Sequence, residues 1–387
     1  MGSCLSLWLA VGMATVWPSS MPAARVETPF SNDEFQPDEG WPLVRGNPLN
    51  NGVATSSLPE KLEVLWEFTV PNGAFQAAAA IVDVGTQKLV VIADADGRVY
   101  ALDFEHGQRV WEFNGELGFA TTPAYRNGRF YIGDVTGVFY CLNSEGNEVW
   151  RFASQQQVDS SANFFDDCVL FGSQDASLYC LRAETGELVW QVETGDQIRC
   201  SPTIVGGRAF AAGCDGYLHM IDLQTGQPLD KVDIRSPTGS TPAARDQMIF
   251  FGTEQAGFLA VNWEQANIVW EYSADGANSI RGNAAVIEDH VVFATSNRQA
   301  ISLHPGTGQV NWTTTLRSGS ESSPVIVGER VFVPVTGGRL YELRLANGEV
   351  VNEWELRGRI TASPSVGFGR LILATERGVV VCFGAKD

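Results

Sequence analysis

The stretch ASLYCLRAETGELVW, residues 176–190, decides the fold, because versions of it recur about every 40 residues. A second clear copy, GRVYALDFEHGQRVW, occupies residues 97–111. One glycine of the copy marks a turn, and it recurs as Gly107, Gly146, Gly186, Gly226, Gly308 and Gly348, with Ala266 in the fifth place. A repeat of this length is typical of solenoids and propellers, in which each unit buries its apolar face against its neighbours.

Each repeat contains four short segments that are typical of β-strands, separated by turn residues. We expect a Ser/Thr-Pro strand such as residues 121–123, an apolar strand such as 130–133, a Tyr-x-Leu strand such as 100–103, and an outer strand that carries a tryptophan. Four strands form one blade of a β-propeller. Eight units begin near Ala77, Thr121, Ser160, Cys200, Ser240, Gly282, Ser322 and Ala362.

The last repeat reaches Asp387 without an outer tryptophan strand of its own. Residues 62–70, LEVLWEFTV, form such a strand ahead of the first repeat. We expect this N-terminal strand to complete the eighth blade, because pairing the two ends of the chain removes an open edge that would invite aggregation. The predicted fold is all-β: a single eight-bladed β-propeller of four-stranded blades.

A tryptophan recurs once in most units, and we interpret it as packing between blades rather than as a stacking site for a ligand. Trp354 is displaced by two residues relative to its turn, and the unit that turns at Gly226 has Asp230 in the tryptophan position. The predicted packing residues are Trp66, Trp111, Trp150, Trp190, Trp270, Trp312 and Trp354.

Composition excludes some classes of partner. The chain has 387 residues, 44% of them hydrophobic, and a formal net charge of −19. Such a charge disfavours nucleic acid and anionic membrane surfaces, both of which require a basic face. We expect a soluble monomer that does not span a membrane.

The seven cysteines and four histidines do not form a metal-binding pattern. Cys141, Cys180 and Cys382 stand where other repeats carry alanine, so we interpret them as small core residues. A Cys168–Cys180 bridge across a hairpin is the alternative. No CxxC pair or zinc-ligand spacing occurs. The Asp94-x-Asp96-Gly97 segment resembles the start of a calcium loop, but a hairpin turn explains it better.

The first 40 residues differ in character from the repeats. Residues 5–17 are an apolar run of the length of a signal-peptide core, so we expect a signal peptide over residues 1–24, a flexible linker over 25–40 and the propeller over 41–387. This organisation predicts a periplasmic or secreted protein. The start MGSCLS also fits a myristoylation pattern, and Cys4 lacks the motif that precedes a lipoprotein anchor.

Candidate binding residues come from the repeat frame. The residue just before each first strand should face the mouth of the axial channel, and these residues are Gln76, Ala120, Asp159, Arg199, Gly239, Arg281, Glu321 and Thr361. One hypothesis is a polar funnel for a small ligand or a partner loop, in which the two arginines hold a carboxylate. The alternative is two ion pairs, Asp159–Arg199 and Arg281–Glu321, that seal the channel. The predicted binding set is Gln76, Asp159, Arg199, Arg281, Glu321 and Thr361.

The lead-in WPLVRGNP, residues 41–48, and the repeat core, G-x-x-Y-A-L-D followed by T-G-x-x-x-W, resemble the PQQ-like β-propeller repeat family. The resemblance implies one of two branches. Quinoprotein dehydrogenases hold PQQ and a calcium ion on the propeller axis, whereas the BamB branch is non-enzymatic and serves outer-membrane protein assembly in the periplasm. The chain lacks the adjacent cysteine pair and an evident calcium site of the first branch, and the lipid-anchor cysteine of the second.

These observations predict an exported, non-enzymatic scaffold whose partners are other proteins, including envelope or membrane-protein assembly components, and which needs no cofactor. The alternative is a PQQ-binding oxidoreductase with calcium, or a degenerate relative that binds a ligand without turnover. A third hypothesis is a sugar- or lactone-processing enzyme with Asp159 and Glu321 as its acid–base pair.

Overall fold

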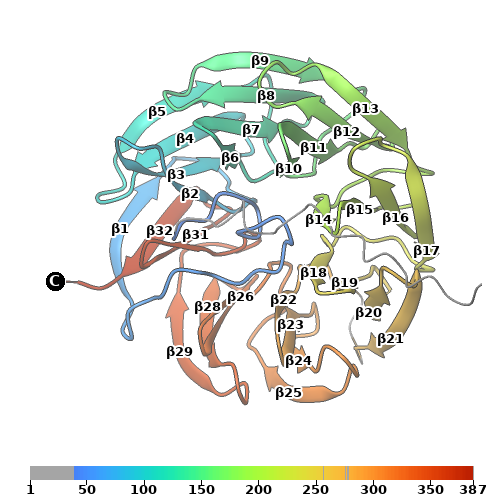
Figure 1. Ribbon diagram of the computed structural model, residues 1–387. Coiled ribbons are helices and arrows are strands. Elements are labelled where there is room, and N and C mark those ends of the chain that lie inside the picture. The colour runs from blue at the N-terminus through green and yellow to red at the C-terminus, as the bar shows by residue number, and fades with distance from the viewer. Residues whose placement is uncertain (1–38, 256, 275, 277–278, 387) are drawn as a thin grey trace, which may run out of the picture.

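The computed structural model describes residues 39–255, 257–274, 276 and 279–386. These residues form eight four-stranded antiparallel sheets that follow one another around an axis as the blades of a propeller (Figure 1). The predicted fold class is therefore confirmed. The predicted signal peptide, residues 1–24, and all but the last two residues of the predicted linker lie outside the described residues.

The blades follow the chain in order, and their strands are as follows. Blade 1 contains β2 (Ala80–Asp83), β3 (Lys88–Ala93), β4 (Arg98–Asp103) and β5 (Arg109–Asn114); blade 2 contains β6 (Ala124–Arg126), β7 (Arg129–Gly133), β8 (Val138–Asn143) and β9 (Glu148–Ala153); blade 3 contains β10 (Asn163–Phe165), β11 (Cys168–Gly172), β12 (Ser177–Arg182) and β13 (Leu188–Glu193); blade 4 contains β14 (Thr203–Val205), β15 (Arg208–Ala212), β16 (Tyr217–Asp222) and β17 (Pro228–Asp233). Blade 5 contains β18 (Ala243–Arg245), β19 (Met248–Gly252), β20 (Gly257–Asn262) and β21 (Asn267–Ser273); blade 6 contains β22 (Ala285–Ile287), β23 (His290–Ala294), β24 (Gln299–Leu303) and β25 (Val310–Thr315); blade 7 contains β26 (Val325–Val327), β27 (Arg330–Val335), β28 (Arg339–Arg344) and β29 (Val350–Glu355); blade 8 contains β30 (Ser365–Gly367), β31 (Arg370–Ala374), β32 (Val379–Gly384) and β1 (Glu63–Thr69).

Burial within a blade follows from its place between two neighbours. The second and third strands are buried on both faces, as β11 and the first five residues of β12 show. The outer strand β13 alternates between exposed and buried side chains towards its end. Continuous apolar runs therefore form the middle of each blade, and alternating sequences form its rim.

The Ser/Thr-Pro segments do not form strands, which corrects one detail of the prediction. In the five repeats that have the proline, the first strand begins directly after it, as β6 begins at Ala124 after Pro123. Proline has no N–H to offer to a strand pair. The hydroxyl residue ahead of the proline instead bonds the next blade.

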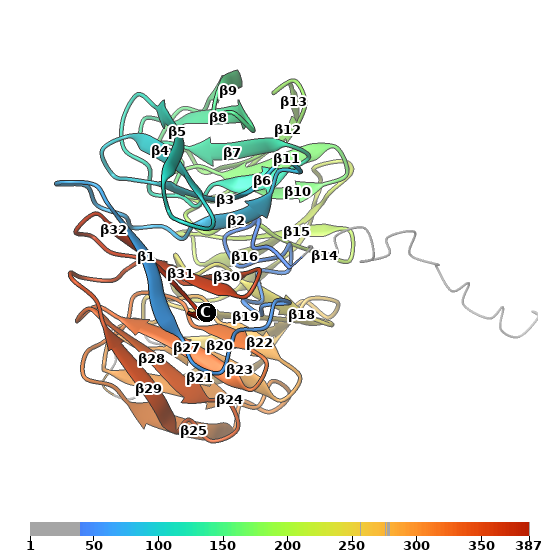
Figure 2. The same ribbon diagram turned by 90° about the vertical axis from the view of Figure 1, so that its left-hand side faces the viewer.

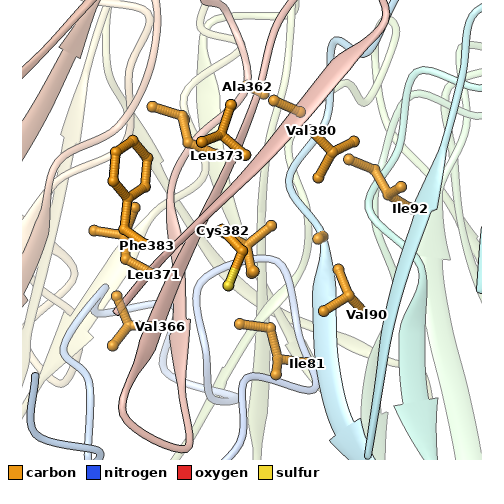
Figure 3. Close-up of a cluster of buried hydrophobic side chains, with 14 of the residues drawn as sticks. Ile81, Val90, Ile92, Ala362, Val366, Leu371, Leu373, Val380, Cys382 and Phe383 are labelled. Atoms are coloured by element: carbon orange, nitrogen blue, oxygen red, sulfur yellow. The ribbon is translucent and has the colours of Figure 1, made fainter. Parts of the chain in front are cut away.

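The ring closes as the sequence predicts. β1 pairs with β32 antiparallel, with Trp66 opposite Cys382, and so supplies the outer strand of blade 8. Figure 3 shows Val380 and Cys382 of β32 facing the blade 1 side chains Ile81, Val90 and Ile92, all of which are buried. The junction between the two ends of the chain is thus packed like the interior of a domain.

Six tryptophans seal the seams between blades by a shared contact. The indole Nε1 donates to a backbone carbonyl of the next blade, at 2.7–3.1 Å, and the indole ring lies against the turn glycine of that blade. The pairs are Trp66–Gly107, Trp111–Gly146, Trp150–Gly186, Trp190–Gly226, Trp270–Gly308 and Trp312–Gly348.

Two seams lack this contact, and at each of them the tryptophan and the turn glycine that would face it are absent together. Asp230 replaces the tryptophan on β17, and the turn that would face it, in the next blade, carries Ala266 in place of glycine. On β29 the tryptophan position is Asn352, and the eighth blade has no turn between its last two strands, because β32 and β1 come from opposite ends of the chain. Trp354 lies one layer further along β29, against Phe383, with ring centroids 5.7 Å apart.

Cys141, Cys180 and Cys382 are buried in the blades, as predicted. Cys168 and Cys180 are both free thiols, so the alternative of a bridge between them is wrong for this structure. Within the described residues, no helix is long and apolar enough to cross a membrane.

Candidate functional site

The predicted mouth residues belong to the loops that enter each blade. The residue just ahead of each one is buried in the apolar core between neighbouring blades, as Val158 and Ile198 are, whereas Asp159 is half-buried and Arg199 is exposed. This alternation repeats in the other blades, so the loops present a ring of accessible side chains at one end of the axis. The axis runs horizontally in Figure 2, with the blades seen edge-on.

Asp159 and Arg199 do not form the ion pair that the sequence suggested as one alternative. The side-chain amides of Gln157 and Gln174 donate to the Asp159 carboxylate. Arg199 donates to Oε1 of Gln197 at 2.8 and 3.1 Å, and no carboxylate pairs with it among the described residues. Nearby glutamine side chains therefore supply the hydrogen-bond partners of both charged groups.

Arg281 and Glu321 do not form the second suggested ion pair, because each has a different partner. Arg281 Nε lies 3.2 Å from Oε2 of Glu254, and Arg359 lies 2.5 Å from the Glu321 carboxylate. Thr361 donates to Oε1 of Glu376 at 3.1 Å. Arg281 does pair across neighbouring blades, but with a residue from the loop after a second strand.

The sequence analysis missed these partners. Gln174, Glu254 and Glu376 occupy the same repeat position, two residues after the end of the second strand of their blades. The backbone N–H at this position donates to the loop that enters a blade, as Glu254 N does to Pro237 O. The signal was available in the sequence, since this position carries long polar side chains in three repeats and shorter side chains in the other repeats.

Below the mouth, a collar of hydrogen bonds joins seven blades. The backbone N–H of the residue before each proline, or its equivalent, donates to the side-chain oxygen of the same position in the next blade at 2.7–3.1 Å. The chain of donors and acceptors runs through Thr122, Ser161, Ser201, Thr241, Asn283, Ser323 and Ser363. The equivalent residue of blade 1 is Ala78, whose side chain has no acceptor atom, so the collar is open at blade 1.

Residues 39–56 form an axial plug that contacts every blade. Backbone carbonyls of this segment accept N–H groups from first strands around the ring, beginning with the exchange between Trp41 and Ile81 at 2.7 and 3.0 Å. The other bonds to the blades come from Tyr125, Asn163, Ile204, Ala244, Val286, Ile326 and Phe368. In Figure 1 the plug is the blue coil over the centre of the ring. The first strands have no neighbouring strand on their axial side, and the plug supplies acceptors for them.

Arg45 holds the plug to the wall of the channel. Its side chain is fully buried, and Nη2 donates to the carbonyls of Ala284 and Pro324, in blades 6 and 7. Burial lowers the pKa of the guanidinium to about 9, which leaves it charged at neutral pH. Gly52 has φ of 65° and lies directly against Nη2, where a Cβ atom would overlap the guanidinium.

The mouth offers little to a quinone cofactor with calcium. A planar tricarboxylate needs cations and a flat apolar surface, but the mouth positions carry no aromatic side chain, and Arg281 is already paired with Glu254. No group of three acidic, histidine or cysteine side chains converges within the described part of the chain. The Asp94 carboxylate accepts from the N–H groups of Asp96 and Arg98 and from the Tyr100 hydroxyl, the pattern of a hairpin turn.

Comparison with known proteins identifies the family. The family model described as outer membrane protein assembly factor BamB matches residues 51–155, 136–227 and 215–387, which together span all eight blades. The chain belongs to this family.

Individual relatives are distant. The BamB of Legionella pneumophila is 26% identical over 225 residues, which are 58% of this chain and half of the length of that protein. The BamB of Burkholderia pseudomallei is 23% identical over 344 residues, 83% of this chain and 88% of that protein. The relationship to BamB proteins thus extends over most of the propeller at low identity.

Solved structures of both branches share the fold. The crystal structure of BamB from Moraxella catarrhalis has a TM-score of 0.68 at 18% identity, covering 84% of this chain and 98% of that one. The quinohemoprotein alcohol dehydrogenase of Comamonas testosteroni has a TM-score of 0.76 at 13% identity, covering 90% and 81%. At these identities both comparisons report the propeller alone, and function has to come from the site.

Proposed function

We propose that this protein is a non-catalytic interaction component of outer-membrane protein assembly, located in the periplasm and bound to other proteins through its loops. The observation that carries the proposal is the match of the BamB family model to all eight blades. The relatives that align with the chain carry the same description. A net charge of −19 favours protein partners over nucleic acid.

The mouth supports a binding role better than a catalytic one. Two amides bind Asp159 and Arg359 binds Glu321, so each carboxylate of the hypothetical acid–base pair is already occupied. The poor match of the mouth to a planar tricarboxylate likewise favours the scaffold over the oxidoreductase. Arg199 is the mouth arginine to which no described carboxylate is bound, so we expect it to contact an acidic group of a partner loop.

Co-purification tests the proposal. The full chain, tagged at its C-terminus and crosslinked in the bacterium that encodes it, should enrich proteins of the outer-membrane assembly machinery from the envelope fraction. The Arg199→Ala variant should recover less of such a partner, whereas Arg245→Ala, at an arginine that pairs with Asp246 outside the mouth, should recover the same amount. A saturable rise in melting temperature on titration with PQQ and calcium, without enrichment of assembly proteins, would favour the oxidoreductase instead.

A further inference from the structure

A groove of about 850 Å³ separates the outer halves of blades 7 and 8. One wall is the face of β1 and β32 that carries Val64, Thr69, Val381 and Phe383, and the other wall is the end of β29 with Trp354. The lining extends along the chain from Val64 to Gly73, so the groove follows the whole of β1. At about 3.3 Å per residue, the seven residues of β1 give it a length of about 20 Å.

Two positions that carry large rings at most other seams carry smaller side chains at this one. The third residue of a repeat's third strand is tyrosine in blades 1, 2, 3 and 7, where Tyr100, Tyr140, Tyr179 and Tyr341 stand. It is His219 in blade 4 and Ile301 in blade 6. In blade 8 this position is Val381. Asn352 of blade 7 also stands where six of the other seven outer strands have tryptophan. The seam is therefore short of two aromatic side chains.

The other seam without a tryptophan provides an internal comparison. Blade 5 has Leu259 at the tyrosine position, and Asp230 of blade 4 replaces the tryptophan. A hollow lies at this seam too, lined by Leu259 and Glu271, but its volume is only about 210 Å³. We attribute the larger volume of the groove between blades 7 and 8 to two differences. Val381 is smaller than Leu259, and blade 8 is built from both ends of the chain.

Two unpaired arginines stand together at the groove. Arg357 and Arg377 line its rim, both exposed, and neither guanidinium has a partner among the described residues. Of the lining carboxylates, Glu355 lies 2.8 Å from Arg339, and Glu376 lies 3.9 Å from Arg359. Glu67 is the lining carboxylate with no cation partner among the described residues, so two unpaired arginines stand against one unpaired carboxylate on a chain whose net charge is −19.

We propose that this groove seats an extended peptide segment of a partner protein, with apolar side chains in the seam and an acidic side chain on Arg357 and Arg377. A groove of this length accommodates about six extended residues, whose alternate side chains point to the same side. Charge-assisted, bidentate contacts from arginine suit a carboxylate. The inference rests on the proposed scaffold function and names a surface for it.

Val381→Tyr fills the groove with the side chain that the repeat itself uses. In blade 7 the equivalent Tyr341 hydroxyl accepts from the backbone N–H of Arg317, and the residue equivalent to Arg317 at this seam is Arg357. The new hydroxyl should therefore find the N–H of Arg357. Leu259→Tyr makes the same change at the seam between blades 4 and 5 and serves as the matched control.

Selection of phage-displayed random octapeptides on the full chain tests the proposal. We expect enriched peptides to combine an aspartate or glutamate with alternating apolar residues. Synthetic copies should bind Val381→Tyr and the double variant Arg357→Ala/Arg377→Ala at least about tenfold more weakly than the wild type, and Leu259→Tyr equally well. Circular dichroism and melting temperature check that each variant is folded.

Three results would overturn the groove as a binding site: no enrichment, enriched peptides without acidic residues, or equal binding to Val381→Tyr. Co-purification from cells separates this failure from failure of the scaffold function. Assembly proteins recovered equally with Val381→Tyr would leave the function in place and remove the groove from it. If peptides bind the groove but no assembly proteins are recovered, the groove would remain a binding site and the proposed scaffold function would fail.

Discussion

The contact between Trp190 and Gly226 allows a quantitative test of how the seams are held. Gly226 has φ of 69°, and a Cβ atom there would lie 2.7 Å from Cγ and 2.8 Å from Cδ2 of Trp190. An alanine in the left-handed region costs about 1–2 kcal/mol. Overpacking against a buried ring adds about 1–3 kcal/mol. Gly226→Ala should therefore lower the free energy of unfolding by about 2–5 kcal/mol.

Ala266 is the natural control, because it holds the same turn position with φ of 51° where no tryptophan faces it. Ala266→Gly relieves backbone strain but increases the freedom of the unfolded chain, so we expect a change within about 1 kcal/mol. Trp190→Ala should cost about 3–5 kcal/mol through its cavity. In that background Gly226→Ala should cost only the backbone strain of about 1–2 kcal/mol.

Urea unfolding followed by circular dichroism measures all four variants. The reasoning predicts a coupling energy of about 1–3 kcal/mol between Trp190 and Gly226. If Gly226→Ala costs the same with and without the indole ring, the ring does not exclude a side chain from the turn, and the pairing of tryptophan with glycine needs another cause.

Three further outcomes follow from buried groups. Burial raises the pKa of Cys200 to about 12, above its value of about 8.5 in the unfolded chain, so stability should fall as the pH rises from about 9 to 12; Cys200→Ser, which matches Ser160 of the neighbouring blade, should remove about 3 kcal/mol of this loss at pH 11 in pH-dependent urea titrations. Gly52→Ala places a side chain against Arg45 at a positive φ, so it should lower the melting temperature more than Gly328→Ala, which has a positive φ but open space around it. Ser201→Ala removes the acceptor for the N–H of Ser161 and should cost about 1–3 kcal/mol in the same unfolding assay, whereas Ser57→Ala, at an exposed position, should cost little.

The repeat predicted the blades because its signals are local. Turn glycines and apolar strands recur at a fixed spacing, and each strand pairs with its neighbour in the chain. The closure of the ring was predictable for a related reason, since residues 62–70 match the strand that the last repeat lacks. The loss of tryptophan at Asp230 and of glycine at Ala266 was also visible in the sequence, and only the structure shows that these residues face each other's positions across one seam.

The plug and the mouth contacts could not be predicted in the same way. The plug binds the blades through backbone carbonyls, as Pro48 does to Ile204, and backbone contacts leave no pattern of side chains. Arg45 stood in the lead-in motif, but nothing in its sequence context indicates that it lies on the axis. At the mouth, the repeat frame placed Arg281 and Glu321 in adjacent blades, yet long side chains reach several loops, and each found a nearer partner in Glu254 and Arg359.

The places where the repeat is broken are the places where this protein differs from a uniform ring. A propeller made of identical blades would have eight equivalent seams, and no partner could choose among them. Here Ala78 interrupts the collar at blade 1, and Val381 with Asn352 opens the seam between blades 7 and 8. Both departures flank the blade that the two ends of the chain build together. Closure with an N-terminal strand stabilises the ring, and it also leaves blade 8 without the turn whose glycine would face an outer-strand tryptophan of blade 7. A binding surface can form there at the lowest cost to the fold, which is why we expect partner recognition to centre on the junction of the two ends of the chain.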